Sequence, residues 1–161
     1  MTRSSESAMD WPEDDPIEPI TAIERASHVT TVDDLRRRWR SLMGDGGFGR
    51  TSLWIIWFDE RGQQLPVVVP IDDLPAELEP DGVDNLIMII GSPAELGAAS
   101  VALLLSRPGP GSVIDEDRRR ANQILAGVHR AQQRGALELK VWPLHLATTD
   151  SVRQLPVDDL L

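Results

Sequence analysis

The sequence LWIIWFDERGQQLPVVV, residues 53–69, contains two apolar runs separated by a polar turn. Its first six residues are rich in β-branched and aromatic side chains, and LPVVV (65–69) follows the DERG turn. This pattern predicts a β-hairpin. The first run has no polar alternation, which is typical of a central strand buried on both faces. Because Pro66 and Pro70 cannot donate to a neighbouring strand, the second run is predicted to be an edge strand.

Upstream of the hairpin, residues 32–43 are predicted to form a helix. Thr31 is the expected N-cap, and Asp34 places a carboxylate near the positive end of the helix dipole. One apolar stripe follows at helical spacing, made of Val32, Leu35, Trp39, Leu42 and Met43. Arginines are expected to fill the remaining face, at Arg36, Arg37, Arg38 and Arg40. Gly44 ends the helix, and residues 44–50 (GDGGFGR) form a glycine loop without the GKS or GKT ending that grips phosphates.

Downstream of the hairpin, the pattern predicts two further strands and one short helix. Residues 71–85 are strongly acidic and are expected to form loops and turns. The apolar run LIMII at 86–90 is predicted to be the third strand. Residues 92–95 (SPAE) combine an N-cap serine, an early proline and a capping-box glutamate, which is a helix-start signal. This helix must be short, because Gly97 weakens it and VALLL at 101–105 predicts a fourth strand.

The longest predicted helix spans roughly residues 116–134. It follows the turn RPGPG at 107–111, which cannot form regular structure, and it is capped by Asp115 or Ser112. Its core stripe is made of Ala121, Ile124, Leu125, Val128 and Ala131, and Gly135 closes it.

The chain is predicted to end in a long strand and a short one. Apolar and polar residues alternate from Leu137 to Leu146, with a bulge at Pro143, and a last strand lies near 152–155. These elements predict a single α/β domain over 28–161, with a mixed sheet of about five to six strands and two main helices. Residues 1–27 are acidic, proline-containing and without apolar period, so they are predicted to be a disordered tail.

Composition excludes several classes of function. The 161 residues carry a net charge of −10 and no cysteine, which excludes disulfides, thiolate zinc sites and a cysteine nucleophile. The acidic charge argues against nucleic-acid binding, which needs clustered Lys and Arg. Membrane insertion is not expected, because no apolar stretch is long enough to span a bilayer and the start is acidic, so we expect a cytoplasmic protein.

The motifs of the common enzyme classes are missing from the sequence. The histidines at 28, 129 and 145 are not at metal-ligand spacing, and neither GxSxG nor GxGxxG after a strand is present. The three acids Asp115, Glu116 and Asp117 lie in one helical turn, which is the placement that the helix dipole favours. We therefore expect no catalytic residues, no metal and no cofactor.

Residues 98–147 resemble the second half of RadC-like domains of the JAB/MPN metalloprotease fold. The shared layout is an apolar strand, a Pro/Gly-rich turn, an acid-started long helix and an apolar strand that ends near a histidine. In that family the turn reads HxHPxG, and an aspartate at the following helix start completes a zinc site. Here the turn reads LSRPG at 105–109, so Pro108 matches and both histidines are missing. Asp117, or Asp115 with a one-residue gap, matches the acidic ligand, and His145 matches the later histidine.

The resemblance extends over about 53–155 and implies a three-layer domain that has lost its metal. One carboxylate cannot retain zinc without the two imidazoles, and without zinc there is no activated water. Metal-free domains of this fold typically bind proteins. The chain also looks like an actinobacterial group of proteins that combines RPG, an acid-rich helix start and WPLHLAT (142–148), a resemblance that implies no activity.

Two functions follow as alternatives. The first is a non-enzymatic protein-interaction or scaffold domain with an unidentified protein partner, in which the acidic tail folds on the partner or back on arginines 36–40 or 118–120. The second is an enzyme or small-ligand-binding protein that uses the 107–117 loop, at the edge where open α/β sheets bind ligands. The candidate contact residues are Arg107, Asp115, Asp117, His145, Arg36, Arg37 and Arg40.

Overall fold

Strand β3 (Ser100–Ser106) lies in the middle of a six-stranded mixed sheet of order β2-β1-β3-β5-β6, to which β4 is added beside β3. The computed structural model describes residues 26–44 and 50–155. β1 (Ser52–Phe58) pairs antiparallel with β2 (Gln64–Asp72) on one side and with β3 on the other. The predicted hairpin, the central position of its first strand and the edge position of its second strand are confirmed.

The other half of the sheet is built from the C-terminal residues. β4 (Lys140–Val141) and β5 (His145–Thr148) run parallel to β3, and β6 (Ser151–Gln154) returns antiparallel to β5. The predicted strand at 137–146 is therefore interrupted next to Pro143, and the predicted last strand is β6. The mixed α/β class with five to six strands is confirmed.

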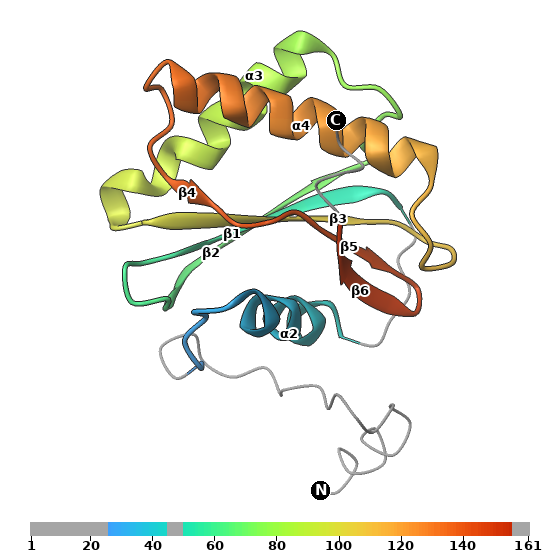
Figure 1. Cartoon of the computed structure of the whole chain (residues 1–161), viewed down its shortest axis with the longest axis horizontal. Coiled ribbons are helices and arrows are strands. Elements are labelled where there is room, and N and C mark those ends of the chain that lie inside the picture. Colours follow the sequence, from blue (N-terminus) through green and yellow to red (C-terminus); the bar gives the residue numbers. More distant parts are fainter. Residues whose placement is uncertain (1–25, 45–49, 156–161) are drawn as a thin grey trace, which may run out of the picture.

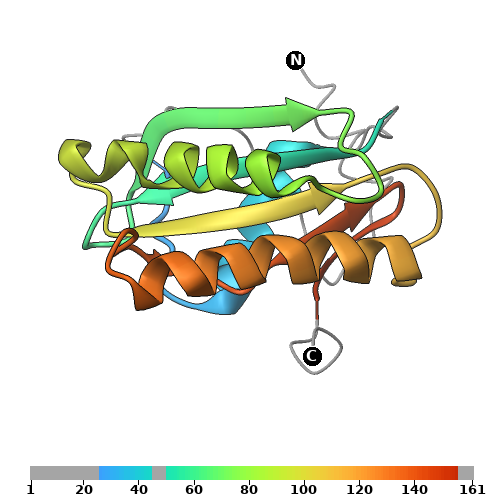
Figure 2. The same ribbon diagram turned by 90° about the horizontal axis from the view of Figure 1, so that it is seen from above.

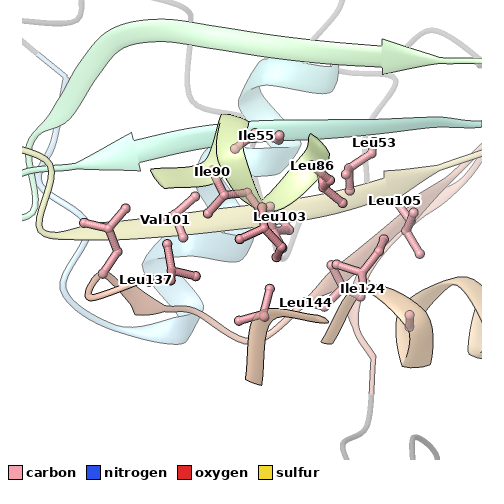
Figure 3. Packing of buried hydrophobic residues seen from close by; sticks show 14 of the residues in the cluster. Leu53, Ile55, Leu86, Ile90, Val101, Leu103, Leu105, Ile124, Leu137 and Leu144 are labelled. Atoms are coloured by element: carbon pink, nitrogen blue, oxygen red, sulfur yellow. The ribbon is translucent and has the colours of Figure 1, made fainter. Parts of the chain in front are cut away.

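Helices cover both faces of the sheet (Figures 1 and 2). α2 (Val32–Met43) lies on one face, and α3 (Pro80–Gly91) and α4 (Asp115–Gln133) lie on the other. Successive side chains of a strand point to opposite faces, so β1 and β3 feed two cores. The α3–α4 core contains Leu53, Ile55, Trp57, Val101, Leu103 and Leu105, most of which Figure 3 shows beside the helices. The α2 core contains Ile56, Phe58, Ala102 and Leu104 with Leu35 and Trp39 of the helix.

The run LIMII at 86–90 is not a strand, and the prediction is wrong there. It forms the second half of α3, which begins at Pro80 inside the stretch expected to be loop. A short apolar run cannot by itself distinguish a strand from a buried helix. Its burial is helical, because Val83, Leu86, Ile87 and Ile90 are buried while Met88 is 72% exposed.

Two predicted N-caps are also wrong, although the helices they belong to are present. The short helix is the 3-10 turn η2 (Ser92–Leu96), and its N-cap is Gly91, because Ser92 already continues from α3. α4 agrees with the predicted 116–134 within a residue, but its N-cap is Ile114. The cap bond comes from the third helical residue instead: the Ile114 N–H donates to Asp117 Oδ2 at 3.0 Å.

The helix predicted at residues 32–43 has the predicted bounds and caps. α2 spans the expected residues, Thr31 and Asp34 form a capping box, and Gly44 is the C-cap with φ +69°. Nearly all of the predicted tail at 1–27 and most of the predicted glycine loop at 44–50 lie outside the described residues. Within 26–44 and 50–155, no helix has the length and apolarity to cross a bilayer.

The close approach of α3 and α4 depends on Gly127. A Cβ added at Gly127 would lie 2.4 Å from Val83 Cγ1, whereas a Cβ at Gly82 of α3 would meet no atom within 4 Å. Gly127→Ala is therefore expected to destabilise the protein by about 1–3 kcal/mol, as overpacking does. Gly82→Ala is the control and is expected to stabilise by up to about 1 kcal/mol through helix propensity. Urea unfolding measures both changes, and equal stabilisation by the two substitutions would contradict the packing argument.

Candidate functional site

Arg107 occupies the turn that follows the central strand. It lies one residue beyond β3, its N–H donates to the Ala147 carbonyl at 3.1 Å, and its residue is only 6% exposed. Leu105, two positions earlier, belongs to the α3–α4 core. Because the side chains of a strand alternate, Arg107 points to the same side as Leu105, toward the beginning of α4.

The Arg107 guanidinium forms a bidentate ion pair with Asp117. Nε donates to Asp117 Oδ1 at 2.8 Å, and Nη2 donates to Oδ2 at 2.8 Å. The remaining N–H groups bond to carbonyls of the turn itself: Nη2 to Ser112 at 2.8 Å, and Nη1 to Pro108 and Pro110 at 3.0 and 3.2 Å. A guanidinium has five N–H donors, so every donor has an acceptor and the turn is folded around the cation.

Three effects stabilise the charges of this buried pair. Asp117 is 1% exposed and lies in the first turn of α4, where the helix dipole favours a negative charge. Its Oδ2 also accepts the Ile114 N–H, so both carboxylate oxygens are engaged. Hydrogen bonding to Asp117 raises the pKa of Arg107 above its ordinary value, and burial acts in the opposite direction.

The turn is also joined to the β5–β6 connection, by residues that the sequence did not single out. The Gly109 N–H donates to Thr149 Oγ1 at 3.1 Å, and the Thr149 N–H donates to the Gly109 carbonyl at 3.3 Å. Gly111 lies so close to this connection that a Cβ there would approach Ser151 Oγ to 2.5 Å. Forty residues separate the partners 109 and 149, and no local sequence signal links them.

The other candidate acid does not join the site. Asp115 has a side chain that is 91% exposed, and its partner is Arg118 of the next helical turn, at 3.2 Å. Of the two candidate acids, Asp117 is thus the carboxylate that α4 presents to Arg107.

His145 lies on the opposite face of the sheet. It pairs in register with Leu104, which belongs to the α2 core, so its imidazole faces α2 and not the Arg107–Asp117 pair. Its Nδ1 lies 2.9 Å from the Pro143 carbonyl, which can only accept, so Nδ1 carries the proton. Nε2 is buried and has no hydrogen-bond partner among the described residues. Burial lowers the pKa of His145, and the charge of Arg36 also lowers it.

The arginines of α2 do not form the uniform exposed face that was predicted. Arg38 points inward and is 5% exposed, where it donates to Gln64 Oε1 at 2.7 Å and to the Ser27 carbonyl. Arg36 and Arg37 form ion pairs with Asp33 on the same helix. Arg40 is half-buried. A large part of this positive charge is therefore compensated within α2 and its neighbours.

The residues of the turn do not fit a zinc ion. Leu105 and Arg107 stand where the JAB/MPN resemblance requires imidazoles, and the Asp117 carboxylate is engaged by a guanidinium. Within the described part of the chain, no three His, Cys, Asp or Glu side chains are grouped so that they could hold a metal ion. A scan of protein-family models finds no match to this chain, and a search of curated proteins finds no significant match.

The ion pair generates the first site prediction. Asp117→Ala leaves the Arg107 cation buried without its partner, which is expected to cost about 3–5 kcal/mol of stability. The matched control is Asp115→Ala, which removes a carboxylate from the same helical turn. It is expected to lower the free energy of unfolding far less, because the Asp115 side chain is exposed. Unfolding in guanidinium chloride measures the free energy of unfolding of both variants. Similar losses in the two variants would show that the pair does not hold the turn.

His145 generates a pH prediction. The pKa of His145 is lowered in the folded protein, whereas in the unfolded chain its imidazole has the ordinary pKa of about 6.5. Below that pH, the unfolded state therefore binds more protons than the folded state. Stability should therefore fall as the pH drops from 6.5 toward the lowered folded pKa, by up to about 1.4 kcal/mol per pH unit. His145→Leu should reduce this slope, and His129→Gln, at an exposed position, should keep it. Urea unfolding between these pH values tests the prediction, which fails if the two variants have the same slope.

Proposed function

We propose that this chain is a non-enzymatic protein-interaction domain, a relative of the JAB/MPN hydrolases that holds an arginine where those proteins hold a metal. The observation that carries the proposal is the buried Arg107 guanidinium, bound by both oxygens of Asp117. A guanidinium supplies positive charge to the carboxylate and order to the turn. It has no open coordination position and cannot activate a water molecule as zinc does.

The order of the elements supports the proposed relationship. A hairpin and a helix precede the central strand, and a Pro/Gly-rich turn, an acid-started helix and a parallel strand follow it, with helices on both faces of the sheet. Leu105 and Arg107 share the face that Asp117 approaches, which is the arrangement that two imidazoles and a carboxylate would need. His145 departs from the expected layout because it lies across the sheet.

The surroundings of the turn argue against hydrolysis by other residues. Asp117 is neutralised by an ion pair, and its oxygens accept three donors from Arg107 and Ile114. Among the candidate residues, His145 is the one that could act as a general base, but it is fully buried on the α2 face of the sheet. A general base must reach the proton that it removes, and neither group is free to do so. For the same reason, the 107–117 loop offers few unpaired groups to a small ligand.

Exposed apolar side chains support protein binding. Met88 of α3 and Leu96 of η2 are 72% and 69% exposed, and Ile114 at the start of α4 is 41% exposed. Large apolar side chains and methionine are common at protein interfaces. The α3–η2 side of the molecule is therefore the surface that we expect a protein partner to contact.

The metal-free character has a direct test. Leu105→His combined with Arg107→His should gain about one tightly bound zinc per chain, because the two imidazoles join Asp117 as a third ligand. The wild-type chain should bind no zinc after dialysis and should cleave neither peptide nor isopeptide bonds. Elemental analysis and zinc titration measure the first, and model substrates measure the second.

Controls keep this test decisive. Adding Asp117→Asn to the double variant should abolish the gained zinc site, and tryptophan fluorescence with and without zinc shows whether each variant is folded. Stoichiometric zinc or iron in the wild-type protein, or hydrolysis by it, would overturn the proposed function. A folded double variant without zinc affinity would refute the relationship to the metalloproteases.

A further inference from the structure

A hollow of about 640 Å³ lies at the end of the sheet where β3 begins, opposite the Arg107 turn. It is lined by Glu60 of the β1–β2 turn, by residues between 91 and 99, and by residues 135–139 after α4. Figures 1 and 2 both show that α3, with the η2 turn that follows it, and α4 finish at this end of the sheet. Three segments far apart in the sequence thus form one surface depression.

Both charged residues that line the hollow are acidic and exposed, and Arg61, Arg134 and Lys140 adjoin lining residues in the sequence without lining it. Glu60 and Glu138 both line it, and neither has an ion-pair partner among the described residues. The carboxyl ends of helices carry partial negative charge, and two helical segments end here. The last turns of α3 and η2 contain no basic residue, and that of α4 contains only Arg130. Lys140 does not line the hollow, since its Nζ lies 4.8 Å from the centre of the Trp142 ring.

The walls between the two carboxylates are small and partly apolar. Gly97 and Gly135 follow the two helix ends with φ of +95° and +75°, and a Cβ at either position would meet no atom within 4 Å. Ala94 and Ala136, which are exposed, supply apolar surface nearby. A cation with an aliphatic stem fits these walls, because its stem lies on the apolar part while its head reaches a carboxylate.

We infer that this hollow binds a basic side chain, arginine or lysine, of a partner protein. The inference rests on the proposed protein-interaction function and names the chemistry of its partner. A bare metal ion is a poor occupant, because only two carboxylates face the hollow and the described residues contain no third ligand grouped with them. Leu96, 69% exposed and next to Gly97, gives the segment around the basic residue an apolar contact. Arginine in such a setting is a common interface anchor.

The test uses the full-length protein and the probe peptide acetyl-Gly-Arg-Gly-amide, followed by amide NMR shifts. Titration should move the signals of residues 94–99 and 135–139, and the same peptide with citrulline in place of arginine should not move them. Replacing both glutamates, with Glu60→Gln and Glu138→Gln, should raise the Kd for the arginine peptide at least about fivefold. This is the effect of losing about 1 kcal/mol of ion-pair energy.

The control is Glu77→Gln with Glu79→Gln, which removes the same net charge from exposed positions near the beginning of α3. It should leave the Kd nearly unchanged. Equal shifts with citrulline, equal weakening by the control pair, or no shifts at saturating arginine peptide would each overturn the inference. None of these outcomes affects the zinc and hydrolysis measurements, which test the proposed function separately.

Discussion

The buried ion pair between Arg107 and Asp117 is the interaction on which the connection from β3 to α4 depends. It joins the residue after the central strand to the first turn of the long helix, and it binds the carbonyls of the turn between them. Burying two charges is costly, and the cost is offset only when the geometry is good and the remaining donors and acceptors are satisfied. Both conditions hold here, because all five guanidinium N–H groups have acceptors. The pair therefore fixes where α4 begins and which face of the sheet it covers.

The two ends of the sheet, where β3 begins and where it ends, differ in how far their charged groups are paired. At the end where Arg107 lies, α4 begins with three acids, and the most buried of them, Asp117, is neutralised by the Arg107 guanidinium. At the opposite end, where the helices end, Glu60 and Glu138 line a hollow, and its lining within the described residues includes no basic side chain. At the Arg107 end, the polar groups already bond to one another, so few of them are left to bind further polar groups. The end whose lining glutamates form no ion pair within the described residues is the one for which we propose electrostatic selection of a partner.

The sheet itself separates the residues that sequence reasoning had grouped together. Arg107 and Asp117 lie on the α3–α4 side, and His145 lies on the α2 side in register with Leu104. Burial of His145 lowers its pKa and so favours the neutral imidazole. Its role in this structure is therefore in the packing of α2 on the sheet, and not in chemistry at the turn.

The sequence by itself determined the elements whose signals are local. The apolar runs of β1, β2 and β3, the Thr31 capping box and the stripe of α4 predicted their elements within a few residues, because strand period, helix period and capping are set by neighbouring residues. The sequence also named Asp117 as a candidate, but together with Asp115, and the position at a helix start did not decide between them. Only the tertiary structure decided the rest: LIMII at 86–90 is helical because one of its faces packs against α4 and the sheet. The pairing of Arg107 with Asp117 and the side of the sheet on which His145 lies are set by strand register and helix placement. The same placement puts Glu60 and Glu138, which are distant in the chain, in the lining of one hollow.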